Sequence, residues 1–186
     1  MTKELTTWII ADPHLGHEKI LGYERTRGVF GTIEEHDNHI IGLWKERVKK
    51  RDVVYLMGDI AAHKNALARY RELGGHGLKQ THLILGNHDK LALPNYQELF
   101  CSVRMFAEWK GILLTHFPIH PASVRPRYRG NLFGHQHGQA SANWAGGQCI
   151  CPEQLGDFGP VPIESVIPPG WPTVGQWLRA RKGKRD

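Results

Sequence analysis

The chain has 186 residues, three cysteines and a formal net charge of +6 at neutral pH. This length can bury roughly two thirds of the surface of the unfolded chain around one core, so we expect a single domain. Three cysteines do not make a disulfide framework, the N-terminal apolar run is too short for a signal peptide, and no apolar run reaches the roughly 18 to 20 residues that cross a bilayer. We therefore expect a reduced, cytoplasmic protein with no membrane partner.

Most of the positive charge lies at the C-terminal end. The last eight residues carry five positive charges and one negative charge. Such a run is typical of a solvated terminus and is weak support for a nucleic-acid partner. We therefore predict one domain at residues 1–178 and a basic, disordered tail at residues 179–186.

The first half of the chain alternates strand and helix patterns. Thr32 followed by Glu35 resembles a capping box, and apolar residues at helical spacing then predict a helix to about residue 49. A second helix is predicted at residues 65–73, where two glycines end it. Strands are predicted at residues 6–11, 53–57 and 83–85. This order indicates β-α-β units.

The second half is richer in strands and lacks a long helix between the first two of them. Prolines and glycines from Pro152 onward predict irregular chain, followed by a short helix at residues 173–181. The spacing of Cys149 and Cys151 suits two side chains on one face of a strand better than a zinc site. Strands are predicted at residues 103–106, 111–115, 131–133 and 148–151.

Five predicted strand ends carry side chains that bind metal ions. These donors are carboxylates, an amide and imidazoles, without a thiolate, and they suit divalent manganese, iron, zinc, nickel or magnesium better than a structural zinc site. Seven ligands are too many for one tetrahedral ion but fit two ions about 3.5 to 4 Å apart that share a carboxylate. The seven are Asp12, His14, Asp59, Asn87, His116, His135 and His137.

Taken in chain order, the short sequence blocks that hold these seven residues resemble the five signature motifs of the calcineurin-like metallophosphoesterase superfamily. The match extends from about residue 8 to residue 137, and the Asp-x-His-x-Gly-His phrase that starts at Asp12 is similar to small bacterial and phage members. The blocks are Asp12-Pro13-His14, Gly58-Asp59, Gly86-Asn87-His88-Asp89, His116 and Gly134-His135-Gln136-His137.

The resemblance implies an α/β fold, a four-layer αββα sandwich of two mixed β-sheets flanked by helices. It also implies two divalent cations, for which we expect manganese, with iron, zinc, nickel or magnesium as alternatives. Asp59 would bridge the two cations. One cation would be held by Asp12, His14 and His137, and the other by Asn87, His116 and His135.

The resemblance gives His88 a different role. Because imidazole exchanges a proton near neutral pH, His88 could donate one to the leaving oxygen or stabilise phosphoryl charge. The cations would polarise the phosphoryl oxygens and activate a water as hydroxide. Asp89 would either orient His88 or cap the turn that follows the loop.

Further candidates lie beside the blocks. His17 follows His14 by three residues, and we expect it to contact substrate or a bound metal from the rim, with an ordinary loop residue as the alternative. Arg125, Arg127 and Arg129 could pair with a phosphate, although a solvated loop would have the same composition. Four further histidines of the first half are expected to be exposed on a helix or near loop or strand edges; these are His36, His39, His76 and His82.

These features predict a dinuclear metal-dependent hydrolase of a phosphate ester. A phosphodiester or nucleotide is the favoured substrate, with a nucleic acid as a further candidate, and no protein partner can be inferred. A phosphomonoesterase using the same site is the main alternative. A noncatalytic binding protein that retains the fold is the second alternative.

Overall fold

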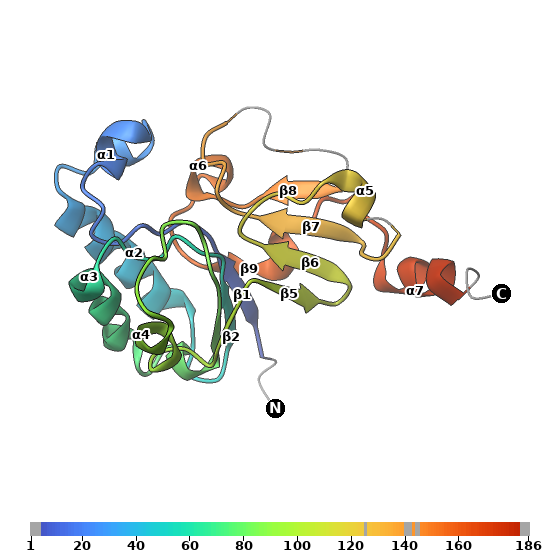
Figure 1. Ribbon diagram of the computed structural model, residues 1–186, viewed down its shortest axis with the longest axis horizontal. Coiled ribbons are helices and arrows are strands. Elements are labelled where there is room, and N and C mark those ends of the chain that lie inside the picture. The colour runs from blue at the N-terminus through green and yellow to red at the C-terminus, as the bar shows by residue number, and fades with distance from the viewer. Residues whose placement is uncertain (1–4, 125, 140–142, 144–145, 183–186) are drawn as a thin grey trace.

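The computed structural model describes residues 5–124, 126–139, 143 and 146–182. The described chain is an α/β fold with two mixed β-sheets and flanking helices (Figure 1), as the sequence predicted. The first sheet has the order β4 (Ser102–Arg104), β3 (Thr81–Ile84), β2 (Val53–Leu56), β1 (Thr7–Ile10) and β9 (Val161–Pro162). The second has the order β5 (Phe106–Trp109), β6 (Ile112–Thr115), β7 (Gly130–Phe133) and β8 (Gly147–Cys149).

Most neighbouring strands are parallel, so their carboxyl ends share an edge. Strands β1 to β4 pair in parallel, as do β6 to β8. The antiparallel strands lie at the sheet edges, where β9 pairs with β1 and β5 pairs with β6. Residues 161–162, expected to be irregular, thus add a strand to the first sheet.

The strand predicted at residues 103–106 is wrong in its extent. Met105 separates β4 from β5, and these two strands belong to different sheets. The chain therefore passes from one sheet to the other within a single residue. Period-two patterning cannot reveal such a crossing, because both strands keep an extended backbone.

Two helices were predicted in the first half, and both are present. In α2 (Ile33–Arg47), the Thr32 side chain accepts a hydrogen bond from the Glu35 backbone N–H at 3.1 Å. The second prediction corresponds to α3 (Lys64–Ala68), capped by His63 and continued by a 3-10 helix, Arg69–Leu73. The short helices are α1 (Ile20–Tyr23), α4 (Leu93–Gln97), α5 (Pro121–Val124) and α6 (Pro152–Leu155), with 3-10 turns at Arg27–Val29, Leu78–Gln80 and Ile163–Val166.

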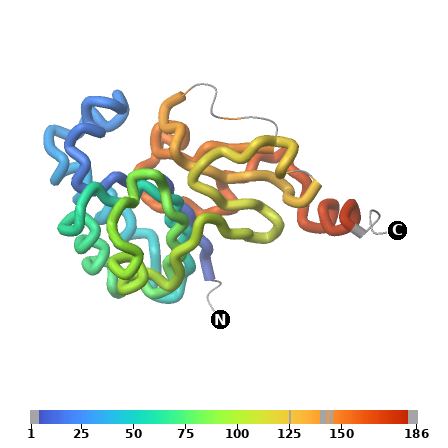
Figure 2. Tube along the Cα trace, in the orientation of Figure 1, coloured from blue at the N-terminus to red at the C-terminus, as the bar shows by residue number. Residues whose placement is uncertain are grey.

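The predicted start of the C-terminal tail, at residue 179, is too early. Residues 179–182 belong to the last helix, α7 (Val174–Lys182), and residues 183–186 lie outside the described part of the chain. Figure 2 shows α7 at the opposite end of the long axis from α1. No helix within the described ranges is long and apolar enough to cross a membrane.

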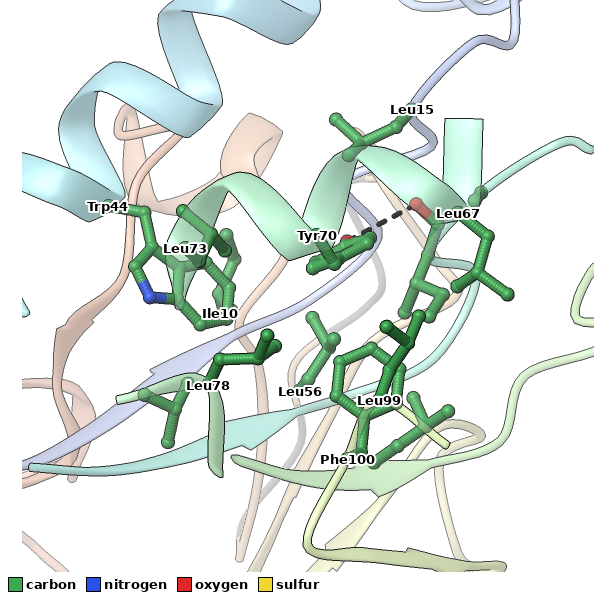
Figure 3. Packing of buried hydrophobic residues seen from close by; sticks show 14 of the residues in the cluster. Ile10, Leu15, Trp44, Leu56, Leu67, Tyr70, Leu73, Leu78, Leu99 and Phe100 are labelled. Atoms are coloured by element: carbon green, nitrogen blue, oxygen red, sulfur yellow. Dashed lines mark hydrogen bonds between the residues drawn. The ribbon is translucent and has the colours of Figure 1, made fainter. Parts of the chain in front are cut away.

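The first sheet is buried on both faces. Ile10 packs with Trp44 and Tyr70 under the helices (Figure 3), whereas Ile9 faces the second sheet and joins the cluster of Ile112. Helices α2, α3 and α4 cover the outer face of the first sheet (Figure 1). Trp109 and Trp171 are buried in the cluster between the sheets, whereas Trp144 lies outside the described residues.

The cap of α2 can be tested by Thr32→Ala, which removes the oxygen that accepts from Glu35. We expect a loss of about 1 kcal/mol in the free energy of unfolding, measured by chemical denaturation. Thr32→Ser, which keeps the hydroxyl, should retain most of the stability. Equal stability of the alanine variant and the unmodified protein would contradict the capping role.

Candidate metal centre

The seven predicted ligand residues converge at one place between the two sheets. The Asp59 Oδ2 atom lies 3.7 Å from His14 Nε2 and 3.4 Å from His116 Nε2. Asp12 Oδ1 lies 3.7 Å from His137 Nε2, and Asn87 Oδ1 lies 3.0 Å from His116 Nε2. The site therefore draws on the ends of β1, β2 and β3 in one sheet and of β6 and β7 in the other.

Asp59 is shared by two groups of potential ligand atoms. The ligand atoms of Asp12, His14 and Asp59 lie within 4.8 Å of one another, and so do those of Asp59, His116 and His135. A carboxylate common to both groups is the arrangement that a pair of divalent cations requires.

The buried side-chain nitrogens of the site fit cation ligands. His14 Nε2 is buried and has no hydrogen-bond partner within the described chain. Burial, reinforced by the nearby Arg27 charge, lowers the pKa of His14 to about 2, so the ring is neutral and carries a free lone pair. His116 Nδ1 lies 2.9 Å from the Met57 carbonyl, to which it can donate, and this leaves Nε2 directed at Asp59.

The two carboxylates lie in a strongly coupled polar cluster. Burial raises the pKa of Asp12. Burial also acts to raise the pKa of Asp59, but the interactions with His116, His88 and His14 together outweigh it and lower the pKa of that carboxyl to about 2. Burial acts to lower the pKa of His116, but its interactions with Asp59 and Asp12 outweigh burial and raise the pKa to about 9. Asp59 is thus held as an anion, the form that binds cations.

Five of the seven residues adopt a left-handed backbone. Such backbone costs of order 1 to 3 kcal/mol per residue and tends to occur at functional sites. Within the described ranges, Lys110 is the one other non-glycine residue with positive φ. The φ angles are 51° at Asp12, 49° at His14, 51° at Asp59, 69° at His135 and 45° at His137.

The glycines of the blocks let these side chains approach the backbone. A Cβ atom at Gly86 would overlap the Asp59 carboxylate, and one at Gly134 would overlap Asp12 Oδ2. Gly58 has a φ of +84°, and a Cβ there would lie 2.6 Å from a His116 ring nitrogen. The glycine before each of these ligand blocks is thus a steric requirement of the site.

His88 lies at the exposed mouth of the centre. Its backbone N–H donates to Asp59 Oδ1 at 2.8 Å, and its ring centroid lies 5.5 Å from that of His14 and 6.0 Å from that of His17. His88 contributes no atom to the ligand groups above. The His17 ring contacts His14, with 3.2 Å between their Nδ1 atoms, so His17 lies at the rim of the centre.

Asp89 has a different role from orienting His88. Its carboxylate accepts hydrogen bonds from the backbone N–H groups of Asp59 and Ile60, both at 2.9 Å, and of Gly86 at 2.8 Å. These bonds join the loop after β2 to the loop after β3. Asp89 therefore positions the backbone of two loops, which is closer to the turn-capping alternative.

The described part of the basic loop does not support the predicted phosphate contacts. Arg129 is buried and donates to the backbone carbonyls of Pro172 and Lys110, so its predicted contact with substrate is wrong. Arg127 is exposed, and its carbonyl accepts from Trp177 of α7, on the side of the molecule away from α1 (Figure 1). Arg125 lies outside the described residues.

A buried polar network supports the centre and was not found from the sequence. Arg27 is fully buried; it donates to the Asp12 carbonyl at 2.7 Å and to Glu153 Oε1 at 2.6 Å. The second oxygen of Glu153 lies 3.3 Å from His137 Nδ1, which leaves Nε2 facing Asp12. His36 belongs to this network at 3.3 Å from Arg27, so its predicted exposure is wrong.

A thiol also reaches the centre. Cys151 Sγ donates to Asp12 Oδ2 at 3.2 Å and lies 3.4 Å from Cys149 Sγ. Burial raises the pKa of the Cys151 thiol, which keeps it protonated and able to donate. The strand predicted at residues 148–151 ends at Cys149, so Cys151 does not share a strand face with Cys149 as the spacing suggested.

The steric role of Gly134 gives a test. In Gly134→Ala the new methyl group would displace the Asp12 carboxylate, so we expect metal affinity to fall about 10- to 100-fold. Calorimetric titration with manganese would measure the change, and far-ultraviolet circular dichroism would check the fold. Gly42→Ala, where nothing lies within 4 Å of the added Cβ, is the matched control. Unchanged affinity in Gly134→Ala would contradict the close approach.

Parts of two known proteins are similar in sequence to this chain. An uncharacterised protein of Methanocaldococcus jannaschii is 34% identical over 83 residues, which cover 45% of this chain and 46% of that protein. The Gene 66 protein of Mycobacterium phage D29 is 39% identical over 88 residues, which cover 45% of this chain and 40% of the phage protein. The matched region thus spans less than half the length of either relative.

The fold is also found in a solved structure. A crystal structure of a protein of unknown function from Aquifex aeolicus has a TM-score of 0.66 and 23% identity, and covers 88% of this chain and 98% of that chain. The model of the calcineurin-like phosphoesterase family matches residues 5–111. Since that match takes in more than half of the chain and the first three strand ends of the centre, the chain belongs to the calcineurin-like phosphoesterase family.

Proposed function

We propose that this protein is a dinuclear metal-dependent phosphodiesterase, with manganese as its preferred metal. The observation that supports this best is the position of Asp59, whose carboxylate is common to two groups of ligand atoms. When bound, two divalent cations would supply Lewis acidity to the phosphoryl oxygens and to a nucleophilic water. All seven ligand positions keep a side chain able to bind a cation, which argues against a noncatalytic descendant of the family.

The protein side of the reaction is divided between positioning and proton transfer. Met57 and Glu153 accept from the Nδ1 atoms of His116 and His137, so both rings direct Nε2 into the centre. His88 is exposed at the mouth beside His17 and donates a ring proton to the oxygen of the departing alcohol. Because the mouth is open at His88 and Asn87, a nucleotide or a nucleic-acid strand has access.

A phosphomonoesterase is the second candidate function, since the ligand geometry alone suits either ester. Bis-p-nitrophenyl phosphate and p-nitrophenyl phosphate, each assayed with manganese, distinguish the two. We expect the diester to have the larger kcat/KM. A larger value for the monoester would replace the proposed activity with phosphatase activity.

The shared carboxylate provides a direct prediction. The unmodified protein should bind roughly two manganese ions per chain, and Asp59→Asn should bind fewer, because both cation sites lose an anionic ligand. The variant should also lose diesterase activity with every metal. Metal content after gel filtration would measure this. Gln136→Ala, which alters a residue between two ligands, should retain metal content and activity. Full occupancy and activity in Asp59→Asn would exclude the shared-carboxylate arrangement.

The proposed proton donor can be tested through the leaving group. An alkoxide needs a proton to depart, whereas p-nitrophenolate scarcely does. His88→Asn should therefore lose about 10²- to 10⁴-fold in rate on an alkyl or nucleoside ester and much less on a p-nitrophenyl ester, with its metal content intact. Equal losses on both esters would instead indicate stabilisation of phosphoryl charge. Loss of the metals would mean that His88 is a ligand.

A further inference from the structure

Two hollows of different chemical character flank the metal centre. A polar hollow of about 550 Å³ includes His14, and its lining also carries His17, Glu18, Lys19, His63, His88 and Lys90. An apolar hollow of about 360 Å³ includes His116, and its lining carries Leu85, Met105, Phe106, Leu113, Phe117 and Ile119. His14 and His116 both approach Asp59, so the centre lies between the two hollows.

The apolar hollow presents large hydrophobic side chains to solvent. Met105 is 66% exposed, Phe106 59% and Phe117 41%. Burial of such surface by a ligand is favourable, and a concentration of exposed apolar side chains around one concavity is typical of a binding site. The Thr115 hydroxyl in the lining donates to the Phe117 carbonyl at 2.6 Å. The hollow therefore offers apolar contact more than hydrogen bonding.

Phe117 connects this hollow to the metal centre. Its ring centroid lies 4.9 Å from that of His116 and 4.5 Å from that of His135. A group bound against Phe117 is therefore within reach of a phosphate held at the centre. The volume of about 360 Å³ is more than twice that of the roughly 150 Å³ apolar cavity that accepts benzene. An aromatic ring system directly attached to the phosphate fits this place.

We propose that the apolar hollow binds an aromatic substituent of the substrate, while the second substituent of the same phosphodiester lies in the polar hollow. This inference rests on the proposed function and specifies its substrate class as a diester with one aromatic and one polar substituent. Phe106 and Phe117 in the apolar hollow would select the aromatic substituent over a polar one. On the other side, the two cations Lys19 and Lys90 outnumber the one carboxylate, Glu18, and favour a polar or anionic group.

Binding of two non-hydrolysable probes to the manganese-loaded protein tests the aromatic side without requiring turnover. Phenylphosphonate and methylphosphonate share the phosphoryl head and differ in the organic group. We expect phenylphosphonate to bind about tenfold more tightly, because its ring is transferred from water into the apolar hollow. Calorimetric titration gives both dissociation constants.

Variants assign that preference to the hollow. Phe106→Ala and Phe117→Ala should bring the two constants to within about twofold of each other, with the metal content of each variant measured because Phe117 contacts two ligand rings. Leu178→Ala on α7 removes another exposed apolar side chain and should keep the preference. Equal binding of the two probes by the unmodified protein, or an undiminished preference in both phenylalanine variants, would overturn the inference.

Other outcomes separate this inference from the proposed function. If the protein hydrolyses bis-p-nitrophenyl phosphate but shows no phenyl preference, the activity stands and the aromatic pocket is wrong. If light scattering shows a dimer that Phe106→Glu dissociates, and the phenyl preference is absent, the hollow is an interface with a second copy of the chain. If neither phosphonate binds and no ester is hydrolysed, the proposed function and this inference both fail.

Discussion

The burial of two carboxylates at one point is the constraint on which this structure depends. Asp12 is fully buried and Asp59 nearly so, and neither can remain charged there without close positive partners. The backbone N–H of His135 donates to Asp12 and that of His88 donates to Asp59, so each acid binds a loop from elsewhere in the chain. The glycines before the ligands, the left-handed backbone of five ligand residues and the contact between the two sheets all bring these loops together.

Much of the fold and the set of candidate ligands could be predicted from patterns among residues close in sequence. The capping box before α2 and the apolar runs of β1, β2 and β3 depend on residues close in sequence, and these elements were predicted near their observed bounds. The ligands were also accessible, because parallel strands place their carboxyl ends along one edge of a sheet. The order of the blocks, more than any single block, identified the family.

Features that depend on contacts distant in sequence were missed. Arg27 and Glu153 form an ion pair across 126 positions, and neither lies in a pattern that distinguishes it from a surface residue. Arg129 has the composition of a phosphate ligand, yet its guanidinium satisfies backbone carbonyls in the interior. The change of sheet at Met105 leaves no local signal either. In each case the role is set by the partner, which only the folded chain supplies.

The left-handed backbone at the centre restricts which amino acids can serve there. Asp, Asn and His enter this region several-fold more readily than other residues that have a Cβ atom, and branched or bulky side chains rarely do. The five positions with positive φ hold two aspartates and three histidines. Glutamate offers the same carboxylate but not the same tolerance of this backbone. Two conditions therefore restrict the amino acids at these positions: the chemistry of the ligand atom and the conformation of the backbone. An exchange that keeps the ligand chemistry, such as aspartate to glutamate, can still disturb the structure.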